Sequence, residues 1–157
     1  MKKQGPKAQA ITELMLAVFR LNGRLLERGD ALVAPLGINS ARWQVMGAVY
    51  LAGEPMTAPR IASAMGISRQ GAQKTLNRLL DEGLMLQQAN PRHERSVLYA
   101  LSPRGVEAVE AAQARQDAWA ERLAAGAVLV DLRQALRMLA DLQQELDAEA
   151  GADQEGV

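Results

Sequence analysis

The sequence contains no cysteine, few aromatic residues and no long apolar run. Without cysteine the chain can form neither a disulfide framework, nor a thiolate metal site, nor a cysteine-based redox sensor. No stretch is long and apolar enough to span a bilayer, so we expect no membrane partner. The basic start, MKKQGPKAQA, lacks the apolar core of a signal peptide. These absences predict a cytoplasmic protein with an aliphatic core, because aromatic residues make up only 3% of the chain.

Residue sets typical of catalysis are also missing. There is no Ser-His-Asp or Cys-His set, no glycine-rich phosphate loop and no pair of metal-binding histidines. The single histidine and the scattered carboxylates do not form an obvious site for a transition metal. Asp81 and Glu82 are adjacent at an expected helix end, which suits capping and solvation better than acid–base catalysis. We therefore expect no catalytic residue, no metal and no cofactor, and predict that the chain is not an enzyme.

The net charge of zero hides an uneven distribution of charge. Residues 1–56 carry seven basic and four acidic side chains, and residues 57–95 carry six and three. Residues 103–157 carry five basic and eleven acidic side chains. A basic middle and an acidic C-terminal segment suit a DNA-binding centre beside a part that faces away from DNA. Uneven charge is also common in helical proteins, so this signal needs support from the motifs.

Two short helices joined by a tight turn are predicted between Thr57 and Gly83. Thr57 can cap the first helix, and Pro59 is tolerated in its opening turn. Gly66 can adopt the left-handed conformation that ends this helix, and Ser68 can cap the second. Apolar residues fall at spacings that place them on the inner sides of both helices: Ile61, Met65, Ile67, Ala72, Leu76, Leu79 and Leu80.

The second of these helices has a polar face. Its members lie on one side of a helix with 3.6 residues per turn: Arg69, Gln70, Gln73, Lys74 and Asn77. Arg and Lys bind phosphate or guanine, and Asn and Gln can form two hydrogen bonds with adenine in the major groove. This pattern is typical of the recognition helix of a helix-turn-helix. The alternative is an ordinary helical hairpin with a solvated polar face.

A β-hairpin is predicted directly after this pair of helices. Residues 84–87 and 96–101 have the composition of strands. The loop between them contains the turn-forming pair Asn90 and Pro91 and two arginines. Two strands with a basic tip, directly after a recognition helix, form a wing. The two features together favour DNA binding.

Long apolar helices are predicted on both sides of this region. Residues 8–33 carry an apolar stripe near the helical period, and a final helix from about residue 127 has leucines near a coiled-coil seam: Leu129, Leu132, Leu136, Leu139, Leu142 and Leu146. Such helices cannot bury themselves on a small winged helix, so we expect them to pair in a homodimer. The alternative is a helical hairpin within one chain.

The predicted fold is mainly α with a small β-wing, a winged helix-turn-helix flanked by long dimerisation helices. We expect an N-terminal dimerisation helix over 1–36, the DNA-binding winged helix-turn-helix over 37–102 and C-terminal dimerisation helices over 103–157. These are predicted to be parts of one compact chain rather than independent domains.

Several short runs between about residues 40 and 105 carry a family likeness. They are Arg42-Trp43-Gln44-Val45-Met46, Ile61-Ala62, Met65-Gly66-Ile67-Ser68-Arg69-Gln70, Leu79, Glu82-Gly83-Leu84, the wing Asn90-Pro91-Arg92-His93-Glu94-Arg95 and Leu101-Ser102-Pro103-Arg104-Gly105. This sequence resembles the MarR family of transcriptional regulators. The family usually shows Asp-x-Arg-Asp-x-Arg in the wing and then a strand ending in Leu-Thr-x-x-Gly.

The resemblance implies a winged-helix homodimer that binds pseudo-palindromic double-stranded DNA. By position, the residues that look like the major-groove set are Ser68, Arg69, Gln70, Gln73, Lys74 and Asn77. Arg92 looks like the wing-tip residue that enters the minor groove, and Arg95 like the arginine that braces the loop or contacts phosphate. Arg78 is expected to contact phosphate or solvent.

Both acidic positions of the family's wing are replaced in this chain, by Asn90 and His93. We therefore expect the wing to be held differently. His93 can carry charge near neutral pH and would then add to a phosphate contact. The alternative is a surface histidine with no special role.

Many members of the family are repressors released by small, often aromatic ligands. The resemblance implies a pocket between the dimer helices and the winged helix, which Met15, Phe19, Trp43 and Met46 could line. The alternative for these residues is plain core packing. The predicted function is a sequence-specific DNA-binding repressor, with a small hydrophobic or aromatic molecule as a possible effector. The competing prediction is a winged-helix module that docks proteins, whose exposed helix should be apolar rather than polar.

Overall fold

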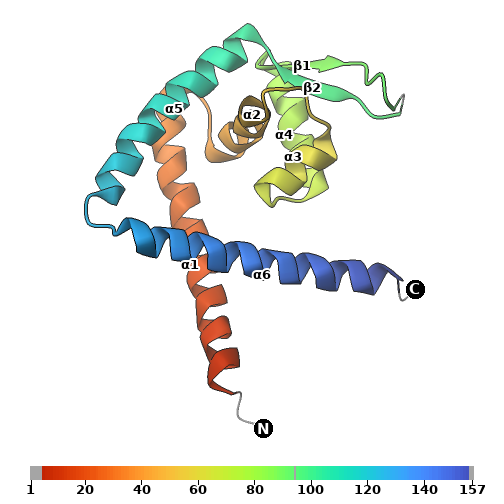
Figure 1. Cartoon of the computed structure of the whole chain (residues 1–157). Coiled ribbons are helices and arrows are strands. Elements are labelled where there is room, and N and C mark those ends of the chain that lie inside the picture. Colours follow the sequence, from red (N-terminus) through yellow and green to blue (C-terminus); the bar gives the residue numbers. More distant parts are fainter. Residues whose placement is uncertain (1–4, 94, 156–157) are drawn as a thin grey trace. The chain divides into compact units, whose positions relative to one another are not determined.

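The computed structural model describes residues 5–93 and 95–155, with side chains described as far as residue 151. Residues 1–4, 94, 156 and 157 fall within the predicted terminal helices and the wing and lie outside the described part. The elements are shown in Figure 1 in chain order: α1 (Pro6–Val33), the 3-10 helix η1 (Ala34–Leu36), α2 (Ser40–Ala52), α3 (Ala58–Met65), α4 (Arg69–Asp81), β1 (Met85–Gln88), β2 (Leu98–Leu101), α5 (Pro103–Ala124) and α6 (Leu129–Glu155). The predicted fold class is confirmed.

Side-chain caps fix where the helices of the winged helix begin. The side-chain oxygens of Asn39, Thr57 and Ser68 accept hydrogen bonds from backbone N–H groups in the first turns of α2, α3 and α4. Each cap satisfies a backbone donor that the helix itself leaves unpaired. Gly66 has φ 61°, in the left-handed region that its lack of a Cβ permits, and it ends α3. The turn between α3 and α4 therefore forms as the sequence predicts.

The core lies beneath α4 and is aliphatic apart from one tyrosine. Ile61 of α3 and Ala72, Leu76 and Leu79 of α4 have no exposed surface, so the apolar sides of both helices face inward as predicted. Tyr99 of β2 is buried in the same cluster. Packing these residues fixes the orientation of α4 and leaves its polar side outward.

The wing is an antiparallel hairpin whose strands pair from Met85 with Leu101 to Gln88 with Leu98. A third piece of chain joins it at Met56, whose N–H donates to the Tyr99 carbonyl at 3.0 Å and whose carbonyl accepts from the Tyr99 N–H at 2.8 Å. This bridge adds a short extended segment before α3 to the edge of the hairpin. The second strand begins later than predicted, at Leu98 rather than at residue 96.

The base of the hairpin is fastened to α5 by hydrogen bonds and close packing. The Ser102 hydroxyl donates to the Gly83 carbonyl at 2.7 Å and accepts from the Gly105 N–H at 3.0 Å. A Cβ at position 105 would lie 2.0 Å from the Leu84 carbonyl oxygen, which is impossible without a backbone shift. Gly105 is thus needed where α5 and the start of the wing meet.

The C-terminal end of α1 is joined to α2 through Ser40. The Ser40 N–H donates to the Asp30 carboxylate at 2.6 Å, and the Ser40 hydroxyl donates to the Leu26 carbonyl at 2.9 Å. Gly29 faces the same point, where an added Cβ would lie 2.6 Å from the Ser40 hydroxyl oxygen. This end of α1 belongs to the core, with Val33 fully buried.

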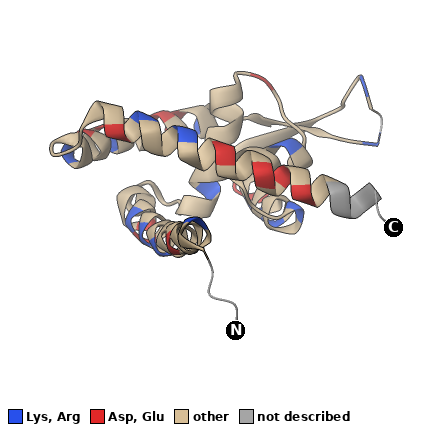
Figure 2. Ribbon diagram, turned by 60° about the horizontal axis from the view of Figure 1, so that its bottom comes forward, with Lys and Arg blue, Asp and Glu red and all other residues tan. Residues whose placement is uncertain are grey.

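The chain divides into two units, the first up to Gln116 and the second from Asp117, so the division falls within α5. In the second unit, all described side chains of α6 are exposed except Leu142. Figure 2 shows acidic residues along the C-terminal half of α6. No helix in the described part is long and apolar enough to cross a membrane.

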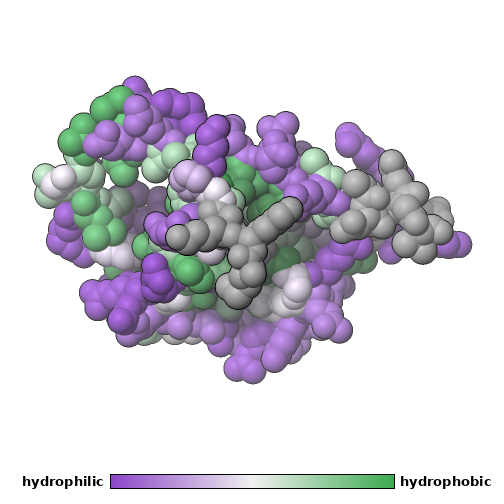
Figure 3. All heavy atoms as spheres, turned by 90° about the horizontal axis from the view of Figure 1, so that it is seen from below, coloured by the Kyte–Doolittle hydropathy of each residue, from purple (hydrophilic) through white to green (hydrophobic). Residues whose placement is uncertain are grey.

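Apolar side chains are exposed on both α1 and α6. They include Ile11, Leu16, Phe19, Leu21, Leu25, Leu129, Leu132, Leu136, Met138, Leu139 and Leu146. Figure 3 shows apolar residues among polar ones on one face of the molecule. These residues account for the apolar stripes seen in the sequence, and each of the two helices presents them on its surface.

Candidate nucleic-acid interface

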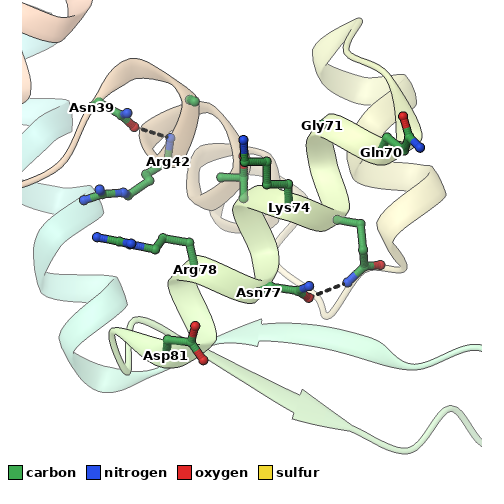
Figure 4. A pocket seen from close by; sticks show the side chains of 11 residues that line it. Asn39, Arg42, Gln70, Gly71, Lys74, Asn77, Arg78 and Asp81 are labelled. Carbon is green, nitrogen blue, oxygen red and sulfur yellow. Dashed lines mark hydrogen bonds between the residues drawn. The ribbon is translucent and has the colours of Figure 1, made fainter.

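The outward side of α4 gathers most of the polar residues that the sequence predicts to contact DNA. Arg69, Gln70, Lys74, Asn77 and Arg78 are all exposed. In Figure 4, Gln70, Lys74, Asn77 and Arg78 line a groove together with the N-terminal end of α2, which contributes Asn39 and Arg42. The two α2 residues were not predicted as site residues, because nothing in the local pattern indicates that they lie beside α4.

Ser68 begins α4 and combines two possible roles. Its hydroxyl oxygen accepts a hydrogen bond from the Gly71 N–H at 3.0 Å and so caps the helix. The side chain is exposed, and a hydroxyl group that accepts one hydrogen bond still has its own hydrogen to donate. Ser68 can therefore donate to a phosphate while it holds the start of the helix.

Gln73 differs from its neighbours on α4 because it is half-buried and already bonded within the protein. Its side-chain nitrogen donates to the Asn77 Oδ1 at 2.9 Å, the dashed line in Figure 4, and to the Tyr99 hydroxyl at 3.0 Å. Gln87 of β1 donates to the same hydroxyl at 3.3 Å. The recognition helix and both strands of the wing therefore meet at one hydroxyl group.

Arg78 of α4 and Arg42 of α2 share one carboxylate. Glu82 lies 2.7 Å from Arg78 and 3.4 Å from Arg42. The Arg78 side chain is 66% exposed, so solvent screens its ion pair and the pair contributes little to stability. Arg78 can accordingly exchange Glu82 for a phosphate at small cost, whereas Arg42 is more enclosed and also donates to the Gly37 carbonyl.

The wing loop presents its basic residues to solvent. Arg92, His93 and Arg95 are all exposed, and Figure 2 shows basic positions at the tip of the hairpin. Asn90 closes the turn, since its side-chain oxygen accepts from the Arg92 N–H at 3.0 Å and its carbonyl accepts from the His93 N–H at 3.2 Å. A neutral amide thus shapes the loop at the first of the two positions where the family usually has an acid.

The four residues predicted to line an effector pocket have very different environments. Met46 is fully buried in the core, and Trp43 is half-buried against that core. Met15 and Phe19 are exposed on α1, Phe19 by 68%. Phe19 is ten residues from Gly29, where α1 meets Trp43, which is about 15 Å along a helix. The role of these four residues as one pocket remains a prediction.

No group of side chains in the described part of the chain is suited to hold a metal ion. The polar residues beside α4 belong instead to the types that pair with phosphates and base edges. Long donors on a rigid helix, next to an exposed basic loop, suit a double helix better than a small substrate. The geometry therefore provides an exposed surface of polar donors suited to binding.

Sequence comparison identifies relatives of this chain. The profile of the MarR family matches residues 36–96. The uncharacterised protein Rv2011c of Mycobacterium tuberculosis is 34% identical over 114 residues, which cover 73% of this chain and 78% of the relative. The uncharacterised protein Mb2034c of Mycobacterium bovis matches to the same extent.

Solved structures share the fold. The MarR family transcription regulator SP03579 has a TM-score of 0.74 at 22% identity, covering 92% of this chain and 95% of its own. A mutant of MarR from Escherichia coli, complexed with operator DNA, has a TM-score of 0.72 at 19% identity, covering 85% and 95%. CouR from Rhodococcus jostii RHA1, bound to p-coumaroyl-CoA, has a TM-score of 0.74 at 21% identity, covering 82% and 90%. The chain belongs to the MarR family of winged-helix transcriptional regulators.

Proposed function

We propose that this protein is a sequence-specific regulator that binds double-stranded DNA as a homodimer and represses transcription from a pseudo-palindromic operator. The observation that carries the proposal is the exposed polar side of α4 beside the basic wing loop. The structurally similar MarR of Escherichia coli was solved with operator DNA. A protein-docking module is less consistent with this surface, because its exposed helix would be apolar.

In this proposal, α4 enters the major groove and the wing lies along the neighbouring minor groove. Arg69, Gln70 and Asn77 contact base edges, because long donors on a helix reach them. Ser68, Lys74 and Arg78 contact phosphates and set the register. Arg92 enters the minor groove, Arg95 adds positive charge beside the backbone, and His93 contacts a phosphate next to it.

The homodimer rests on the apolar residues that the single chain leaves exposed. Phe19 on α1 is 68% exposed and Leu136 on α6 is 66% exposed. Fully burying one such side chain contributes about 1.5–3 kcal/mol, so several together could hold a stable interface. A two-fold pair would present two copies of α4 roughly 34–36 Å apart, one turn of DNA.

The most detailed part of the proposal is a small-molecule effector. CouR, which has the same fold, was solved with p-coumaroyl-CoA, and BpsR of Bordetella bronchiseptica is described as regulated in DNA binding by 6-hydroxynicotinic acid. We propose that a small hydrophobic or aromatic molecule contacts Met15, Phe19, Trp43 and Met46 and releases the protein from DNA. Because Met46 is buried in the single chain, such a ligand would have to displace core packing to touch it.

The proposal is tested by selecting genomic DNA fragments with the purified protein at two salt concentrations. We expect a pseudo-palindrome with half-sites roughly 34–36 Å apart. We also expect the affinity to fall steeply with salt, because phosphate contacts release counterions. Recovery of no preferred sequence would contradict the proposal and favour a docking module or a nonspecific DNA binder.

A further inference from the structure

One buried hydroxyl group connects the recognition helix to the wing. Tyr99 of β2 is only 2% exposed, and its hydroxyl oxygen accepts hydrogen bonds from Gln73 of α4 and Gln87 of β1. The backbone of Tyr99 is held as well, by its two hydrogen bonds with Met56. The hydroxyl is therefore a fixed anchor point in the core directly behind α4.

The anchor reaches the DNA-facing surface through Gln73. A glutamine amide has two N–H donors, and Gln73 directs one to Tyr99 and the other to the Asn77 Oδ1. Both donors are then occupied, so Gln73 lacks the N–H that a two-bond contact with adenine requires. Asn77 is exposed and keeps its own N–H groups for acceptor atoms on a base edge.

We propose that Tyr99 and Gln73 are positioning residues for DNA recognition, which hold the Asn77 side chain in the orientation that reads a base. The inference rests on the proposed function, since it concerns how that surface discriminates between sequences. It changes the role expected for Gln73 from base reader to support. It also makes a residue of the wing strand part of the specificity of the recognition helix.

Tyr99 itself cannot touch DNA, because the wing and α4 cover it. Removing its hydroxyl group changes no charge and leaves the exposed arginines and lysine of the surface in place. The hydroxyl is bonded by Gln73 on α4 and by Gln87 on β1. Of these two, Gln73 is the one that also holds Asn77, so an effect confined to the base pair read by Asn77 would pass through Gln73. A free Asn77 would sample several rotamers and bind its base pair less selectively, while contacts to phosphate would be unaffected.

The test compares Tyr99→Phe with the unchanged protein on the selected site and on sites carrying each single base-pair change. Asn77→Ala first identifies the base pair that Asn77 reads. At that pair we expect Tyr99→Phe to reduce discrimination about 2- to 10-fold, the value of one hydrogen bond. Discrimination at other positions and the dependence on salt should not change. Tyr50→Phe is the matched control, because its hydroxyl contacts Glu110 rather than α4.

A second variant keeps the test decisive if Tyr99→Phe folds poorly. Gln73→Met replaces the amide with a side chain of similar length that favours helix, and we expect it to reduce discrimination at the same base pair. In the double variant, discrimination at this base pair should fall no further than in Gln73→Met alone, because Tyr99 acts on Asn77 through Gln73.

The outcomes separate this inference from the proposed function. Suppose that the unchanged protein prefers a sequence, and that both variants lose affinity equally on all sites or lose none. The positioning role is then wrong, and the proposed function as a sequence-specific regulator is retained. If the unchanged protein has no sequence preference, both are wrong.

Discussion

Leucine side chains of α4 in the winged helix and leucine side chains of α6 have opposite environments. In the winged helix, Leu76 and Leu79 have no exposed surface and each of α2, α3 and α4 begins at a side-chain cap. On α6, Leu136 is 66% exposed and the neighbouring leucines are exposed too. The first region is complete within one chain, whereas the second buries almost nothing by itself. The contrast fits the proposed homodimer, in which a second copy would cover the apolar side chains of α6.

The largest expected effect comes from placing a charge on the exposed seam. Leu136→Asp should break the dimer, because an unpaired charge in an apolar interface costs about 3–5 kcal/mol. Affinity for a two-half-site operator should fall with it. Sedimentation measures the change in mass, and Gln134→Asp adds the same charge off the seam as a control. If Leu136→Asp remains a dimer, α6 is not part of the dimer interface.

A buried leucine should behave differently from an exposed one. Leu76→Ala should lower the free energy of unfolding by about 2–5 kcal/mol, because it leaves a cavity in the core. Denaturant unfolding at two protein concentrations measures this, with Leu136→Ala as the partner variant. For Leu136→Ala, the loss of stability should come mainly from weaker dimerisation and should therefore depend on protein concentration. Equal, concentration-independent losses for both would contradict the contrast between the regions.

The junction between α5 and the wing gives a smaller effect. Gly105→Ala should destabilise the protein by about 1–3 kcal/mol, since the added methyl group meets the Leu84 carbonyl. Gly47→Ala is the control, because a Cβ there has no atom within 4 Å and alanine favours helix. Unchanged stability of Gly105→Ala would mean that the wing base is free to move.

The smallest effect is expected at the wing tip. Arg92→Ala should weaken DNA binding by about 1 kcal/mol and lower the slope of log affinity against log salt by about one, because one phosphate-neighbouring charge is lost. Arg24→Ala on α1 is the control. Fluorescence anisotropy over a salt series measures both quantities, and an unaltered slope and affinity would refute a DNA contact for Arg92.

Local features of the fold could be predicted from the sequence, and contacts between distant residues could not. The caps at Thr57 and Ser68 and the turn at Gly66 depend on neighbours a few residues away, so the pattern reveals them. The bonds from Tyr99 to Gln73 and from Arg42 to Glu82 join residues 26 and 40 positions apart. Only the packed fold brings these side chains together, so the composition of α4 alone could not show that Gln73 is bonded to Tyr99.

The surroundings of the predicted effector residues also depend on packing. Met46 and Phe19 both fall at helical spacing, and the sequence pattern predicted the same pocket-lining role for both. The fold buries the first and exposes the second, because α2 crosses the core while most of α1 extends beyond it. The burial of each residue could therefore not be read from its spacing.

The central claim, a dimer that places two copies of α4 on one face of DNA, is tested most directly by hydroxyl-radical footprinting on the selected site. We predict two equal protected patches related by two-fold symmetry, with centres roughly one helical turn apart. A single protected patch, or uniform protection without symmetry, would contradict the account.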